Sequence, residues 1–135
     1  MPAGSGPQVA RVTAGAPAAA EIALITTAPM NWSAGLPGIL LAASVNFTPG
    51  ASQTSTTLRL RQGAGTGGAL VGIAHPTTTV AAQQLDLAFE ELDTSAFATA
   101  AQAGAQYTLT IQTNAAGPGT VNQAVLTVET SAPIA

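Results

Sequence analysis

The stretch from Leu58 to Gly72 constrains this chain most, because a clear alternation is followed at once by closely spaced glycines. Leu58 and Leu60 alternate with Arg59 and Arg61, which is the two-residue period of a strand with one buried face. The glycines that follow, and the apolar residues after them, predict a turn and a returning strand. The pattern therefore indicates an antiparallel hairpin with both arginines on its outward face.

The glycines of this hairpin also match a second kind of motif. Gly63, Gly65 and Gly68 have the spacing of a dinucleotide-binding loop. Such a loop needs a helix that begins at its last glycine, because the helix N-terminus binds the pyrophosphate. Residues 69–76 are short and are interrupted by a glycine and a proline, which favours a strand. We therefore expect a hairpin and no nucleotide.

Composition narrows the classes of partner. Charged residues make up 7% of the 135 residues, there is no lysine, and the net charge is -3. Nucleic-acid binding needs a cluster of cations, so it is not expected here. The polar surface has to come from Thr, Ser, Gln and Asn, and a nearly neutral surface of this kind favours association. We expect a protein that works in an assembly.

Other features are expected to be missing. The chain has no cysteine, so no disulfide framework is predicted. No apolar run is long enough to cross a membrane as a helix, and the N-terminus lacks the pattern of a secretory signal. We expect no membrane partner.

Alternating segments separated by Gly, Pro and Asn turns fill most of the chain. The predicted strands are residues 21–27, 39–47, 54–62, 70–74, 77–89, 107–113 and 121–129, with an eighth near Val9. Pro76 is expected to stop the strand at 70–74. Residues 93–104 are predicted as a short helix capped by Asp93, Thr94 or Ser95, or as a loop. Eight strands fit an all-β, antiparallel β-sandwich of jelly-roll type, and seven fit an immunoglobulin-like sandwich.

The chain is predicted to have two parts. Residues 1–18 are rich in Gly, Pro and Ala and are predicted as an extended N-terminal arm, followed by a single sandwich domain at 19–135. Val9, Arg11 and Val12 are expected to pair with a strand of the same subunit or of a neighbour, and a disordered leader is the alternative. Residues 21–27 have apolar side chains on both faces, which suggests that one face is covered by the core and the other by another chain or by the arm.

No group of residues predicts catalysis, a cofactor or a metal ion. His75 is the only histidine, whereas a metal site on a sandwich would need two or three. Glu90, Glu91 and Asp93 form the only acidic cluster, and adjacent strand residues point to opposite faces. We interpret them as the solvated end of a strand, with Arg59 or Arg61 of a neighbouring molecule as a partner. The chain is expected to be non-enzymatic.

The single tryptophan is open to three interpretations. Trp32 lies in a predicted loop, where it could cover one end of the core, anchor a protein interface, or stack on a sugar together with Tyr107. We favour the cover over the core, with the protein interface second.

Several of these segments resemble a known group of proteins. The motifs at 58–65, 68–72, 107–112 and 126–129 resemble small virion structural proteins of tailed bacteriophages, and in particular capsid decoration (cement) proteins. The resemblance spans residues 54–129. It implies a β-rich protein, often a homotrimer, that binds the outside of a phage head and stabilises it.

The resemblance also implies where the protein acts and with what. Its partners would be the major capsid protein and copies of itself, and its location the capsid surface after synthesis in the host cytoplasm. The candidate interface residues are Val9, Arg11, Val12, Trp32, Arg59 and Arg61. The alternative function is a carbohydrate- or receptor-binding module of a phage fibre or spike.

Overall fold

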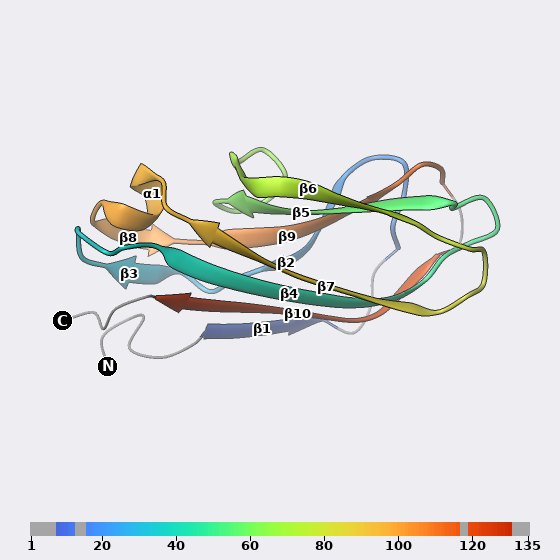
Figure 1. Cartoon of the computed structure of the whole chain (residues 1–135), viewed down its shortest axis with the longest axis horizontal. Helices are drawn as coiled ribbons and strands as arrows, with labels where there is room; N and C mark the ends of the chain where they lie inside the picture. The colour runs from blue at the N-terminus through green and yellow to red at the C-terminus, as the bar shows by residue number, and fades with distance from the viewer. Residues whose placement is uncertain (1–7, 13–15, 117–118, 131–135) are drawn as a thin grey trace.

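The computed structural model describes residues 8–12, 16–116 and 119–130, and their regular structure is almost entirely β. Two four-stranded antiparallel sheets pack face to face (Figure 1). Sheet A has the order β1 (Gln8–Val12), β10 (Thr120–Thr130), β4 (Ile39–Thr48) and β7 (Leu85–Asp93). Sheet B has the order β2 (Ile22–Thr26), β9 (Tyr107–Thr113), β5 (Ser55–Gln62) and β6 (Leu70–Thr78). At one end, β3 (Met30–Trp32) pairs with β8 (Gln102–Ala105).

The strand pairs are nested around the hairpin of β5 and β6. Outward from this hairpin, β4 pairs with β7, β3 with β8, β2 with β9, and β1 with β10. The chain is therefore one long hairpin wound into two sheets, which is jelly-roll connectivity. The sheets of an immunoglobulin-like sandwich have a different strand order, so that alternative does not apply. The predicted all-β jelly-roll sandwich is confirmed.

The core lies between the two sheets and follows the alternation of the strands. Along β4, residues at every second position are buried, from Ile39 to Phe47. Leu58 and Leu60 of β5 face them from sheet B and are 1% and 0% exposed. Burial of each such side chain stabilises the fold by roughly 1.5–3 kcal/mol. The largest fully buried apolar side chains of the described residues are Tyr107, Phe47, Ile39, Leu41, Leu58, Leu60, Leu109, Ile111, Leu126, Val45 and Val121.

Two predicted strand boundaries are wrong. Pro76 does not stop a strand, because β6 continues to Thr78 with Pro76 opposite Thr57. An edge strand tolerates proline since it has a ladder on one side only. The turn instead lies at residues 79–84, so the predicted strand at 77–89 is divided between β6 and β7.

The segment around 93–104 is mostly not helical. It holds a helix of one turn, α1 (Ala96–Thr99), and the strand β8. Of the three predicted caps the helix uses Ser95, whose hydroxyl accepts a hydrogen bond from the Phe97 amide at 3.2 Å. The region predicted as a loop around Trp32 contains β3, the partner of β8.

A shift in register explains the apolar residues on both sides of β2. Ala23 is opposite Thr110 but Ile25 is opposite Leu109, so Leu24 is an extra residue in this strand. Both Leu24 and Ile25 pack against the core as a result. The two-sided pattern therefore does not indicate a second chain over β2.

The described part of the predicted N-terminal arm belongs to the sandwich of its own chain. Gln8–Val12 is the edge strand β1, paired with β10. Farther along, the Pro17 carbonyl accepts a hydrogen bond from Nε2 of the buried Gln53 at 2.9 Å. The rest of the predicted arm, residues 1–7 and 13–15, lies outside the described residues.

Candidate interaction surface

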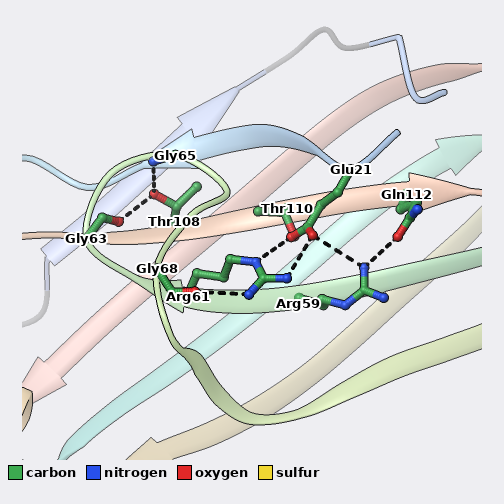
Figure 2. Close-up of polar contacts among 9 residues, drawn as sticks. All are labelled: Glu21, Arg59, Arg61, Gly63, Gly65, Gly68, Thr108, Thr110 and Gln112. Atoms are coloured by element: carbon green, nitrogen blue, oxygen red, sulfur yellow. Dashed lines mark hydrogen bonds and ion pairs between the residues drawn. The ribbon is translucent and has the colours of Figure 1, made fainter. Parts of the chain in front are cut away.

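The two arginines of β5 are held by one carboxylate on the outer face of sheet B. Arg61 binds Glu21 through Nε–Oε2 at 2.6 Å and Nη2–Oε1 at 2.8 Å, and Arg59 Nη1 lies 3.7 Å from Oε1 (Figure 2). The Thr110 hydroxyl donates to the same carboxylate at 2.6 Å, and Arg59 also donates to Gln112 at 2.8 Å. The two guanidinium groups therefore share one carboxylate of the same chain, which compensates one of their two positive charges.

The electrostatics of Glu21 follow from these contacts. The hydrogen bond from Arg61 lowers the pKa of Glu21 below 4.5, against the opposing effect of burial. The same bond raises the pKa of Arg61. Arg59 and Arg61 were predicted to face outward and to meet an acid of a neighbouring molecule. They do face outward, but their acid is Glu21 of the same chain.

The glycine loop beside this cluster is fixed by one threonine. The Thr108 hydroxyl donates to the Gly63 carbonyl at 2.8 Å and accepts from the Gly65 amide at 3.1 Å (Figure 2). The Gly68 carbonyl accepts from Arg61 at 3.0 Å. The chain leaves the loop as the strand β6, so no helix N-terminus faces it. The predicted hairpin is confirmed, and the geometry of a dinucleotide-binding loop is not formed.

Trp32 is enclosed at the end of the sandwich that carries α1. It is 4% exposed, stacks on Tyr107 with ring centroids 6.4 Å apart, and meets the edge of Phe97 at 6.1 Å. Of its three interpretations, the cover over the core fits this position. As a buried side chain it presents no surface to a partner.

Asp93 lies in the same end and is not solvated, contrary to prediction. It is 4% exposed and accepts hydrogen bonds from the Tyr107 hydroxyl at 2.7 Å and from Gln62 Nε2 at 3.2 Å. Burial, followed by this hydrogen bond, raises the pKa of Tyr107 far above 10.0. The pair links β7 to β9 across the sandwich.

The single histidine lies on β6, the edge strand of sheet B, next to the edge strand β7 of sheet A. His75 Nε2 lies 3.1 Å from Glu91 Oε1, and its ring stacks on Phe89 with centroids 4.0 Å apart. The Glu91 carboxylate occupies the space that a Cβ of Gly72 would fill. Within the described residues no group of three His, Asp or Glu could hold a metal ion. None of their helices is long and apolar enough to cross a membrane.

The outer face of sheet A carries few charged groups near its centre, and toward one end its polar side chains bond one another, with Asn46 donating to Asp86 at 2.6 Å and accepting from Asn122 at 2.8 Å. It holds a shallow depression of about 540 Å³, and its outward lining residues are Ala42, Ser44, Ala88, Glu90, Val125 and Thr127. Ser44 lies opposite Ala88 on one side and Val125 on the other, so the centre of this face consists of small, uncharged side chains. Of the predicted interface residues, Val9 and Arg11 border this face, while Val12 packs against the core.

Sequence reasoning missed Glu21 and the outer face of sheet A. Glu21 is distant in sequence from both arginines, and only the sheet order places it beside them. The small residues Ala42, Ser44 and Ala88 alternate with core residues, and this alternation was visible in the sequence. The alternation does not tell which strands are neighbours. The surface that these residues form together therefore follows only from the pairing of β4 with β7.

No family model matches the chain, and no curated protein matches its sequence. Solved structures do match its fold. A chain of the T13 particle of infectious bursal disease virus aligns with a TM-score of 0.58 at 9% identity, over 95% of this chain and 32% of that one. The VP2 subviral particle of this virus aligns at 0.52 and 13%, over 92% and 33%. This chain thus spans about a third of the viral chains it matches.

A weaker likeness, with a TM-score of 0.45 and 12% identity, links 98% of this chain to 96% of a subunit of Bacillus endospore appendages, described as disulfide-linked pili. The alignments with the viral chains, at 9% and 13% identity, establish the β-sandwich fold that this chain shares with viral capsid proteins.

Proposed function

We propose that this chain is a non-enzymatic structural protein of a virus particle, a decoration protein that docks on the outside of a phage head and stabilises it. The observation that carries the proposal is the outer face of sheet A, which is neutral and built from small side chains at its centre. A surface without central charges loses little solvation free energy when another protein covers it.

The size of this face fits such a contact. Four strands, of which β4 has ten residues, give a face on the order of 600 Å² from the usual strand spacing and rise. A standard interface buries about 800 Å² on each partner. The face and its rim therefore supply enough area for a specific attachment, and many copies on one shell would add avidity.

Two further points support a place in a virus particle. The chain shares its fold with capsid proteins of infectious bursal disease virus, and its hairpin and last strands resemble decoration proteins of tailed phages. The ionisable groups that could have served chemistry are used internally, since Glu21 binds Arg59 and Arg61 while Asp93 binds Tyr107. On the resemblance we also propose that the working unit is a homotrimer.

The alternative function is carbohydrate binding by a fibre or spike module, and it would need an exposed aromatic ring on which a sugar can stack. Trp32 and Tyr107 are 4% and 0% exposed, so neither offers a ring face to a sugar. A glycan array with the intact protein tests this rival directly, because specific saccharide binding would favour it over the structural role.

The docking face can be tested with shells of the parent virus prepared without this protein. Ser44→Trp fills the depression on sheet A, and we expect it to weaken binding of the protein to the shells at least tenfold. Ala23→Trp is the matched control, because Ala23 is exposed on sheet B. It should bind like the unmodified protein. Equal binding by both variants would contradict attachment through sheet A.

A further inference from the structure

The two edges of sheet A differ in a complementary way. The edge strand β1 presents Val9, which is 53% exposed, and Arg11. The opposite edge strand β7 presents Glu90 and Leu92, the latter 54% exposed. Neither Arg11 nor Glu90 forms an ion pair with a residue that the structure describes, whereas Arg59 and Arg61 share Glu21. One edge thus offers an unpaired cation, the other an unpaired anion.

The strand directions allow these edges to meet. All three pairings within sheet A are antiparallel, so directions alternate across its four strands and β1 runs opposite to β7. A second copy placed beside the first would therefore bring its β7 antiparallel to β1 (Figure 1). The hydrogen-bond ladder of the sheet would continue from one molecule into the next.

The backbone groups at the two edges also match. Val9, Thr127, Ala42 and Glu90 form one row across the sheet, in register at each step. In antiparallel sheets, hydrogen-bonded and non-hydrogen-bonded pairs alternate from each strand to the next along such a row. Three pairings connect Val9 to Glu90, so the pairings at the two ends of the row are of the same type. On their unpaired sides, Val9 and Glu90 therefore also match: either both are hydrogen-bonding positions or neither is. Their side chains also point to the same face, so outward residues pair with outward residues.

We propose that β1 of one molecule pairs with β7 of a second copy, with Arg11 opposite Glu90 and Val9 opposite Leu92. This register joins the unpaired charges and covers two exposed apolar side chains together. A shift by two residues would instead place Val9 against Glu90 and Arg11 against Ala88, which pairs a charge with an apolar group. In an antiparallel ladder, a cation directly across from an anion is stabilising, and so is an apolar side chain directly across from another apolar side chain.

The edges of sheet B are less suited to this contact. β6 contains Pro76, and its register with β5 shifts between Leu58 and Leu60. β2 has the irregularity between Ala23 and Ile25. Proline and bulges protect an edge strand from pairing with another chain. The edge strands of sheet A, by contrast, pair with their neighbours without a register shift over the residues that the structure describes: β1 with β10, and β7 with β4.

This contact uses two different surfaces, so it is head-to-tail: it closes into a ring or continues as a row of molecules. It goes beyond the proposed function, because it needs no shell and is tested on the isolated protein. Its failure would leave docking through the outer face of sheet A untouched.

Disulfide trapping tests the contact, because the chain has no cysteine of its own. Val9→Cys and Leu92→Cys are made in separate full-length chains with tags of different mass, mixed and oxidised. Opposed residues of a ladder have Cβ atoms about 4.5–5.5 Å apart, close to the separation that a disulfide bridges. We expect a mixed disulfide dimer. The control replaces Leu92→Cys with Ile73→Cys, a 66% exposed position on β6, and should yield at least tenfold less.

Charge exchange provides the second arm. Arg11→Glu added to the Val9→Cys chain, or Glu90→Arg added to the Leu92→Cys chain, should each lower the yield several-fold. The two together should restore it, because the opposite charges meet again. Equal yields from the Leu92 and Ile73 partners would overturn the proposal, as would Val9–Val9 dimers in excess of the mixed dimer or no restoration by the exchanged charges.

Discussion

Arg61 and Glu21 meet in a two-pronged ion pair, with Nε–Oε2 at 2.6 Å and Nη2–Oε1 at 2.8 Å. The pair spans three neighbouring strands, since Arg61 is on β5, Thr110 on β9 donates to the same carboxylate, and Glu21 directly precedes β2. It ties the hairpin at the centre of the nested chain to an outer strand of sheet B.

Removing this arginine should destabilise the fold measurably. Arg61→Ala leaves the Glu21 carboxylate, with a side chain 16% exposed, without its closest cation. We expect a loss of about 2 kcal/mol in the free energy of unfolding, as for hydrogen bonds to charged groups. Gln83→Ala is the control, because Gln83 is exposed in the turn between β6 and β7, and it should change stability by less than about 0.5 kcal/mol. Equal losses in chemical denaturation would contradict this role.

The pH dependence of stability should also trace to this pair. The pKa of Glu21 is lower in the folded protein than the ordinary 4.5. The stabilisation is therefore present above pH 4.5 and is lost as pH falls through the folded pKa. Glu21→Gln should flatten the acid limb of a stability–pH curve measured by urea unfolding, whereas the exposed control Glu129→Gln should keep it. Parallel curves for the two variants would count against this assignment.

Tyr107 should resist ionisation. Burial and the bond to Asp93 raise its pKa above 10.0, so the stability that it contributes is present below pH 10.0 and falls as pH rises further. Because the chain has one tyrosine, its ultraviolet absorbance titrates without interference. We expect no phenolate near pH 10 and its appearance only together with alkaline unfolding. Phenolate formation near pH 10 in the folded protein would refute the buried hydrogen bond.

Gly72 should tolerate a side chain less well than Gly65. Both have positive φ, +67° and +83°, but only Gly72 has the Glu91 carboxylate where a Cβ would lie. Gly65→Ala should cost only the backbone strain of about 1–2 kcal/mol. Gly72→Ala should cost more in thermal unfolding, and adding Glu91→Ala should recover part of that excess. Equal costs for the two glycines would show that Glu91 moves aside freely.

The sequence predicted the parts of this fold that depend on local alternation. The strand at 107–113 and the hairpin after Arg61 appear as expected, because a strand with one buried face has to alternate. The predicted end of a strand before Pro76 was wrong, because the penalty for proline in a strand depends on whether that strand lies at the edge of its sheet. Edge position is a property of sheet order, which no local pattern contains.

The same limit applies to the candidate surfaces. Arg59 and Arg61 were correctly expected to face outward, but their partner Glu21 is brought to them by the order of sheet B. Asp93 was expected in solvent because it follows two other acids, yet its last position in β7 points inward to Tyr107. Contacts between residues far apart in sequence decided both outcomes.

The central claim is that this protein is a structural component of a virus particle. The most direct measurement is quantitative mass spectrometry of purified particles of the parent virus, which gives the molar ratio of this chain to the major capsid protein. We predict a fixed ratio corresponding to many copies per particle, preserved through density-gradient purification and lost when intact particles are treated to release surface proteins. A protein that is absent from purified particles, or present only at trace ratios, would contradict the account.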